Sequence, residues 1–152
     1  MARTGPMRIE IHFVGKPASG PLAPAIADYT ARIEKLCTLR LVNCPTLESR
    51  SAEGRRLMDG LSGNDFVALN TAGKRQSSHE FYAMVAAAQL NRDHTIRFVI
   101  GGATGLPEAV LAEAERQISL SELTMSHDLA RLVLLEQIYR ALATIAGSPY
   151  AK

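Results

Sequence analysis

The sequence is poor in aromatic residues and in cysteine. It has no tryptophan, and aromatic residues make up 5% of its 152 positions. A stacking platform for single-stranded RNA is therefore poorly supplied, so any RNA recognition would rest on phosphate contacts and a shaped pocket. The two cysteines, Cys37 and Cys44, lack the paired spacing of a zinc site. We expect both to be buried, reduced thiols and expect no metal centre.

Long apolar runs are also missing. No stretch approaches the ~20 apolar residues of a membrane span. The first apolar run, from Ile9 to Val14, is short and is interrupted by Glu10 and His12, which distinguishes it from a signal peptide. We therefore expect a cytoplasmic protein with no membrane-bound part.

Neither sign of charge dominates the sequence. Seventeen Lys and Arg residues against 15 Asp and Glu residues give a formal net charge of +2, which permits RNA binding without requiring it. With 47% hydrophobic residues, the length suits one globular domain. We expect residues 1–6 to be an N-terminal extension and residues 7–152 to form a single domain.

Strand-like and helix-like segments alternate along the chain. Ser51 is a plausible N-cap of the second helix, Ser77 or Ser78 of the third, and residues 71–78 are expected to form a loop. This alternation predicts an α/β fold with a mainly parallel sheet flanked by helices. We expect strands over residues 8–14, 39–42, 65–69, 95–100 and 118–120, and helices over residues 24–36, 52–61, 78–90 and 128–146, with another helix beginning at Pro107.

Ligands of open α/β sheets bind beyond the carboxyl ends of the strands. Here these ends lead into residues 70–74, 101–107 and 121–127. The second of these loops contains Gly101, Gly102 and Gly105, but Ala103 and Leu106 break the spacing of a dinucleotide fingerprint, and no P-loop is present. These glycines indicate either a tight turn or close backbone approach to a ligand without phosphate.

Familiar catalytic constellations are absent from the sequence. It shows no paired carboxylates, no Ser-His-Asp arrangement and no metal-ligand cluster at recognisable spacing, which disfavours hydrolases. His127, alone before the last helix, is of a kind more often packed or capping than catalytic. That helix is apolar around much of its circumference, which favours a partner subunit on one side.

Several motifs stand out along the chain, most of them in its C-terminal third: Ile11-His-Phe-Val-Gly-Lys16, Phe98-Val-Ile-Gly-Gly-Ala-Thr-Gly-Leu106, Ile118-Ser-Leu-Ser-Glu-Leu-Thr-Met125, His127, Arg131, Glu136-Gln-Ile-Tyr-Arg-Ala141 and Pro149-Tyr150. Taken together, these motifs resemble the RlmH family of SPOUT methyltransferases over essentially all of residues 7–152. The C-terminal third is the most specific part.

The resemblance implies a SPOUT-type fold with a C-terminal trefoil knot, a homodimer, and S-adenosylmethionine held by the knot loops. Such knots are rare exceptions to chain-threading rules and cannot be inferred from periodicity. The positions that match the family's cofactor contacts are Leu69, Gly101, Leu120, Ser121, Glu122, Leu123, Thr124 and Met125.

The implied reaction is methyl transfer to N3 of a pseudouridine in 23S rRNA of the assembled ribosome. The catalytic candidates are Tyr150, Arg131 and His127. In the family, a C-terminal Tyr-His-basic tail lies at the substrate pocket, and here Ala151 replaces the histidine before Lys152. If that histidine is the base, this chain should be slow or inactive, or should use solvent or Tyr150 instead.

Two alternatives stay open at this point. The chain could be a related knotted enzyme that methylates another RNA position, such as a ribose 2′-hydroxyl or a tRNA base. It could also be a catalytically silent ribosome-binding module that keeps the cofactor pocket. Lys16, Arg8, Lys74 and Arg75 are candidates for contacts with ribosomal RNA.

Overall fold

A computed structural model describes residues 6–47 and 49–150. Strands and helices alternate almost without exception, as the sequence pattern predicts. The elements in chain order are β1 (Arg8–Val14), α1 (Ala23–Glu34), β2 (Thr38–Cys44), α2 (Arg50–Leu61), β3 (Val67–Arg75), α3 (Ser78–Ala87), the 3₁₀ helix η1 (Ala88–Leu90), β4 (Thr95–Ile100), α4 (Glu108–Glu113), β5 (Arg116–Ser119) and α5 (His127–Ile145).

The strands form one sheet in the order β2-β1-β4-β3-β5, and every pairing is parallel. Ile11 of β1, for example, lies between Leu41 of β2 and Phe98 of β4. The predicted parallel α/β architecture is therefore confirmed. Because all strands run the same way, their carboxyl ends meet at one edge of the sheet, where the three loops singled out in the sequence begin.

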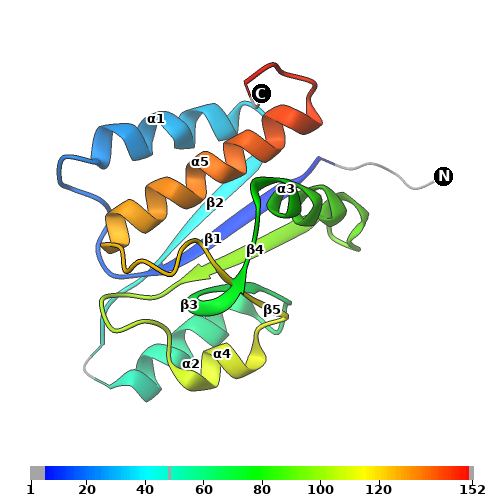
Figure 1. Cartoon of the computed structure of the whole chain (residues 1–152). Helices are drawn as coiled ribbons and strands as arrows, with labels where there is room; N and C mark the ends of the chain where they lie inside the picture. The colour runs from blue at the N-terminus through cyan, green and yellow to red at the C-terminus, as the bar shows by residue number, and fades with distance from the viewer. Residues whose placement is uncertain (1–5, 48, 151–152) are drawn as a thin grey trace.

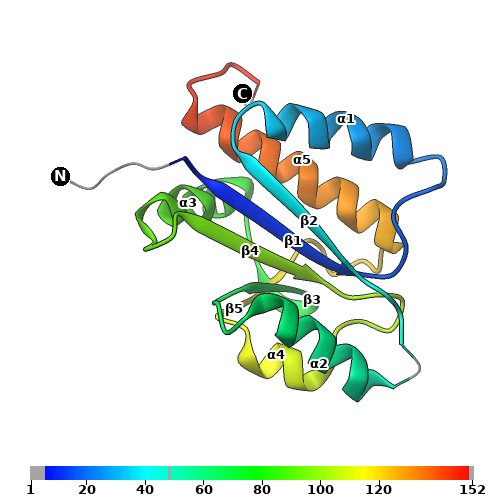
Figure 2. The ribbon, with the colours of Figure 1, turned by 180° about the vertical axis from the view of Figure 1, so that it is seen from behind.

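The sheet is covered on both faces, with α1, α3 and α5 on one side and α2 and α4 on the other (Figure 1; Figure 2 shows the opposite view). Alternation along β1 supplies both layers. Ile9, Ile11 and Phe13 belong to the larger core under α1, α3 and α5, whereas Val14 belongs to the smaller core against α2 and α4.

Side-chain caps fix the starts of three helices. Ser77 forms a complete capping box with Glu80 at the start of α3, as predicted, and Ser126 caps α5. The prediction of Ser51 as the cap of α2 is wrong: the Ser49 hydroxyl accepts from the Ala52 N–H at 3.2 Å. Ser49 has the extended backbone that an N-cap requires, and Ser51 already lies within the first turn of the helix.

The prediction of a loop over residues 71–78 is also wrong, because β3 continues to Arg75. Leu69 and Lys74 both pair with Ile118 of β5, so the intervening residues form a bulge and the strand then resumes. At Gly73 a Cβ would lie 2.7 Å from the Gln117 carbonyl carbon, so only glycine permits this close approach. The sequence pattern obscured the strand because glycine and charged residues are poor strand formers.

Two predictions concern residues outside the described ranges. Residues 1–5 of the expected N-terminal extension and the substitution at Ala151 both lie there. Among the described residues, no helix is long and apolar enough to cross a membrane.

Candidate functional site

A cavity of about 380 Å³ lies beyond the carboxyl ends of β4 and β5 and beside the bulge of β3. Its walls come from the bulge of β3, the loop between β4 and α4, and the loop between β5 and α5. The lining residues are Leu69, Asn70, Thr71, Ile100, Gly101, Gly102, Ala103, Thr104, Gly105, Leu106, Leu111, Leu120, Ser121, Leu123, Thr124, Met125 and Ala130.

The structure brings the predicted cofactor residues to this one cavity, with a single exception. Leu69, Gly101, Leu120, Ser121, Leu123, Thr124 and Met125 all line it. Glu122 does not, and its carboxylate instead lies 3.7 Å from the Arg75 guanidinium. Both partners of this pair are largely exposed, so the ion pair contributes little to stability.

The glycines of the loop after β4 build a tight turn. The Gly105 N–H donates to the Gly102 carbonyl at 3.0 Å, and Gly105 has a φ of +76°, which favours glycine. At Gly101 a Cβ would lie 2.5 Å from the Gly105 carbonyl carbon and 2.6 Å from the Leu106 nitrogen. The turn interpretation is therefore correct for Gly101 and Gly105, and the same turn forms one wall of the cavity.

Arg50, at the start of α2, contacts this turn from outside the cavity. Its guanidinium donates to the Thr104 hydroxyl at 2.7 Å, the Leu106 carbonyl at 2.9 Å and the Thr104 carbonyl at 3.4 Å. Sequence reasoning missed this residue, because the contacts join positions more than fifty residues apart and no local pattern signals them.

The loop after β5 is organised by its own serines. The Ser119 hydroxyl donates to the Ser121 carbonyl at 2.9 Å, and the Ser121 hydroxyl accepts from the Leu123 N–H at 3.0 Å. Leu123 is 76% exposed, and Leu129, one turn into α5, is 39% exposed. Of the two, only Leu123 lines the cavity; large apolar side chains so open to water are typical of binding or subunit surfaces.

His127 lies beside the cavity. It is the first residue of α5 and borders an adjoining hollow of about 360 Å³, which shares Gly101, Thr124 and Met125 with the cavity. Its side chain is exposed to solvent. Of the predicted catalytic residues, His127 is the one that the structure places next to the predicted cofactor residues.

Arg131 lies elsewhere and is buried, with 5% of its surface exposed. Its guanidinium donates to the carbonyls of Lys16 at 2.8 Å and Val14 at 3.4 Å, and it lies 4.0 Å from the centre of the Phe13 ring. Burial lowers the pKa of Arg131, and the nearby Asp128 carboxylate partly opposes this shift. These contacts hold the loop after β1.

Tyr150 does not reach the cavity within its own chain. Its hydroxyl lies 2.9 Å from that of Tyr29 and donates to Glu136 at 3.1 Å, and its ring packs edge-on against Tyr139. None of these residues lines the cavity, and Glu136 lies about 9 Å further along α5 than Ala130, given a rise of about 1.5 Å per residue.

The lining of the cavity limits the chemistry of its ligand. Among the residues that the structure describes, no charged side chain lines it; hydroxyls, one amide and loop backbone supply the polar groups. This lining suits a ligand without phosphate groups that presents both an apolar surface and hydrogen-bonding edges.

Burial raises the pKa of the Cys37 thiol to about 11, which disfavours a cysteine nucleophile at neutral pH.

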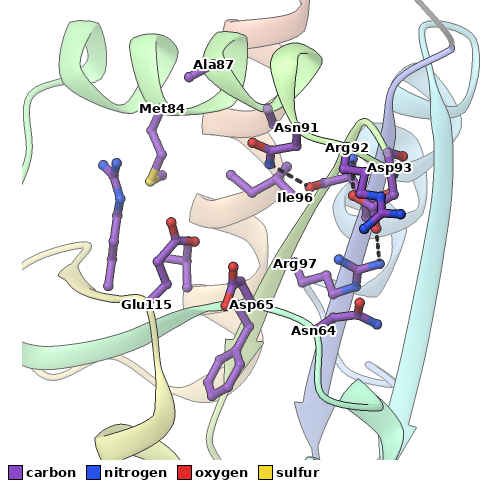
Figure 3. Close-up of a pocket in the computed structure, with 15 residues that line it drawn as sticks. Asn64, Asp65, Met84, Ala87, Asn91, Arg92, Asp93, Ile96, Arg97 and Glu115 are labelled. Carbon is purple, nitrogen blue, oxygen red and sulfur yellow. Dashed lines mark hydrogen bonds and ion pairs between the residues drawn. The ribbon is translucent and has the colours of Figure 1, made fainter.

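A larger hollow, of about 560 Å³, lies at the opposite, amino-terminal edge of the strands (Figure 3). Its rim carries charges of both signs, with Arg92, Asp93 and Arg97 on one side and Asp65 and Glu115 on the other (Figure 3). The Arg97 guanidinium is already paired with Asp93 at 2.7 Å. Open parallel sheets bind ligands at their carboxyl edge, so we take the smaller cavity at that edge as the candidate ligand site.

Comparisons with known proteins show the family of the chain. Residues 7–151 match the family described as "Predicted SPOUT methyltransferase". The chain is 37% identical to a Clostridium botulinum protein named ribosomal RNA large subunit methyltransferase H, over 96% of this chain and 100% of the relative. It is 38% identical, with the same coverage, to a Limosilactobacillus reuteri protein of the same name.

Solved structures share the fold at low sequence identity. A Bordetella pertussis protein described as a probable methyltransferase matches with a TM-score of 0.60 and 13% identity, over 90% of this chain and 95% of that one. The SpoU methyltransferase AviRb from Streptomyces viridochromogenes, solved in complex with AdoMet, matches with a TM-score of 0.50 and 11% identity, over 97% of this chain and 61% of that one. At this identity the likeness is one of fold.

Proposed function

The chain belongs to the SPOUT methyltransferase family, and from this premise we propose that it methylates large-subunit ribosomal RNA with S-adenosylmethionine as donor. The site of methylation is N3 of a pseudouridine in the assembled ribosome. The observation that carries the proposal is the cavity at the carboxyl edge, whose lining has no charged side chain among the described residues and includes every predicted cofactor residue except Glu122. Relatives at 37% and 38% identity over their whole length carry the name of a large-subunit rRNA methyltransferase.

The residues of the cavity fit this donor. Leu69, Leu120 and Met125 provide apolar surface, while Ser121, Thr124 and the loop backbone provide hydrogen-bonding groups for an adenine edge and an amino-acid tail. Side chains that bind phosphate are not needed, because the donor has no phosphate. When bound, S-adenosylmethionine supplies a methyl group on a sulfonium that already carries its own leaving group.

The protein's contribution is alignment and proton removal. The loops after β4 and β5 are held in place, and this fixes the direction from which N3 of the pseudouridine must approach the methyl group. The N3–H of a pseudouridine must lose its proton, and His127 is the ionisable side chain best placed beside the pocket to accept it. Arg131 supports the site indirectly, by holding the carbonyls of the loop after β1.

A homodimer completes the proposal. Tyr150 is held away from the cavity of its own chain, so a tail that acts at a pocket is more simply supplied by a second copy. Leu123, which lines the cavity, and Leu129, at the start of α5, are exposed and offer apolar surface for that copy. We place the subunit contact on the exposed side of α5.

Residues 7–152 then form one SPOUT domain with a C-terminal trefoil knot, acting on ribosomes in the cytoplasm. The knot is supported by family membership and by the strand order β2-β1-β4-β3-β5, in which β5 pairs only with β3. Lys16, Lys74 and Arg75, which flank the carboxyl edge of the sheet, are the proposed contacts with rRNA phosphates, together with Arg8 at the opposite edge.

Incubation of the purified protein with labelled S-adenosylmethionine and ribosomes that lack the modification tests the proposal. We expect label in 23S rRNA of intact ribosomes, at N3 of a pseudouridine. Label in tRNA or on a ribose would instead show a related enzyme of different specificity. Donor binding without transfer to any RNA would show a silent ribosome-binding module.

A further inference from the structure

The turn formed by residues 102–105 is a part of the cavity wall whose tip lies outside the hydrophobic core. Ala103, Thr104 and Gly105 are exposed, whereas Leu106 and Pro107 behind them are buried. A short exposed turn has few packing contacts and opens at little free-energy cost. Something outside the core must therefore fix it if the cavity is to keep its shape.

Arg50 has the geometry to do this. Its two terminal nitrogens reach acceptors on both sides of Gly105: the Thr104 hydroxyl and carbonyl from one, and the Leu106 carbonyl from the other. A planar guanidinium with divergent donors is well suited to such a fork, and hydrogen bonds from a charged donor are stronger than neutral ones. One side chain thus holds the carboxyl-terminal half of the turn, on both sides of Gly105.

The platform that carries Arg50 is rigid. The Ser49 cap fixes the first turn of α2, and Leu57 and Leu61 anchor the helix in the smaller core, each 1% exposed. At Gly54 the same helix approaches Pro107, the N-cap residue of α4, where a Cβ would lie 3.6 Å from the proline Cβ. Helix α2 therefore holds the loop between β4 and α4 at two places. It packs against Pro107 at the carboxyl end of the loop, and Arg50 binds the exposed turn before it.

We propose that Arg50 is a positioning residue for methyl-donor binding: it holds the turn at residues 102–105 in the conformation that the donor requires, without touching the donor. The inference rests on the proposed function, because it needs that cavity to be the donor site. Its specific content is that donor affinity depends on a side chain that does not line the cavity.

Arg50→Met tests this by removing the donors while keeping the length of the side chain. Calorimetry with S-adenosylmethionine should show affinity reduced by roughly tenfold, the size expected when a hydrogen bond from a charged donor is lost. With ribosomes as substrate, the KM for the donor should rise while kcat at saturating donor stays unchanged. Arg50→Lys should recover part of the affinity, and Arg55→Met, at an exposed arginine on the same helix, should bind as the wild type does.

Hydrogen exchange makes the test independent of overall stability. Amides of residues 102–105 should exchange faster in Arg50→Met, while amides of β4 and α2 keep their protection. Donor affinity and loop exchange equal to those of the wild type would overturn the inference. If Arg50→Met does not fold, Arg50→Lys decides: it must show weaker binding and faster loop exchange, and unchanged values refute the proposal. Absence of donor binding by the wild type would instead remove the proposed function itself.

Discussion

The hydroxyl of Tyr150 lies 2.9 Å from the hydroxyl of Tyr29, so the last described residue of the chain is fixed against α1. The same phenol also donates to Glu136 at 3.1 Å. Tyr150 is therefore attached to the helical layer of its own chain and does not line the cavity. Because this contact holds Tyr150 away from the cavity of its own chain, a catalytic role for Tyr150 requires the cavity of a second copy.

Tyr29→Phe should lower the pKa of Tyr150 toward the ordinary value for a phenol. The pKa of Tyr150 is raised chiefly by its hydrogen bond to Tyr29, with burial and the Glu136 carboxylate adding to the effect. Titration of ring-labelled tyrosine by NMR measures the change, with Tyr82→Phe as the control. An unchanged Tyr150 titration would show that the two hydroxyls are not bonded in solution.

Paired inactive variants test the proposed homodimer. A chain with Gly101→Ala and a chain truncated after Pro149 should each be inactive alone. Mixed subunits should regain activity, because one dimer then holds an intact pocket from one copy and an intact tail from the other. Failure of mixed dimers to regain any activity would show that the pocket and the tail must belong to the same chain.

The stability of the protein should fall as the pH drops below about 6.5, the ordinary pKa of histidine. Burial is the largest influence on His12 and lowers its pKa, and the Glu10 hydrogen bond opposes this only in part, with Arg40 and Arg97 favouring the neutral ring. Over this pH range the unfolded chain therefore binds more protons than the folded chain. The free energy of unfolding consequently falls as the pH drops, because protonation of His12 favours the unfolded state. Urea unfolding between about pH 5 and about pH 8 measures the slope.

His12→Gln should flatten this pH dependence, because glutamine fills a similar volume and does not titrate. His79→Gln, at an exposed histidine of α3, should leave the slope as it is in the wild type. An equally steep slope in His12→Gln would assign the effect to other groups.

Arg131→Met should destabilise the fold by about 1–3 kcal/mol, because it leaves buried carbonyl groups without a charged donor. The carbonyls concerned are those of Val14 and Lys16. Arg75→Met, which breaks only the exposed pair with Glu122, should cost no more than about 1 kcal/mol. Chemical denaturation of the two variants separates the effects, and equal losses would refute a structural role for Arg131.

Gly101→Ala should abolish or strongly weaken donor binding. The added Cβ would lie 2.5 Å from the Gly105 carbonyl carbon, and because the obstructing atoms are backbone, the turn itself must move. Gly20→Ala is the matched control, since a Cβ there meets nothing within 4 Å. Calorimetry measures binding and circular dichroism checks the fold. Tight binding by Gly101→Ala would place the donor elsewhere.

The layers of the fold could be predicted from the sequence because strand and helix periods are local. Alternation over residues 8–14 and the apolar run at residues 95–100 identify the two central strands. The extension of β3 to Arg75 could not be predicted, because it depends on pairing with β5 more than forty residues later. Its residues have low strand propensity of their own.

The candidate site was predictable to a similar extent. Loops that follow parallel strands converge on one edge, which is why Leu69, Gly101 and Met125 meet at the cavity. The direction of Glu122, the burial of Arg131 and the contacts of Arg50 depend on tertiary packing that no local pattern records. The family resemblance identified the residues, and the structure shows where each of them lies.

Isothermal titration of the purified, folded chain with S-adenosylhomocysteine, the demethylated product of the donor, tests whether the loops after β4 and β5 form a methyl-donor pocket. We expect saturable binding that is lost in Gly101→Ala and retained in Gly20→Ala. A folded wild-type sample that releases no binding heat with either the product or S-adenosylmethionine, and shows no change in hydrogen exchange at residues 101–106 and 120–125, would contradict it.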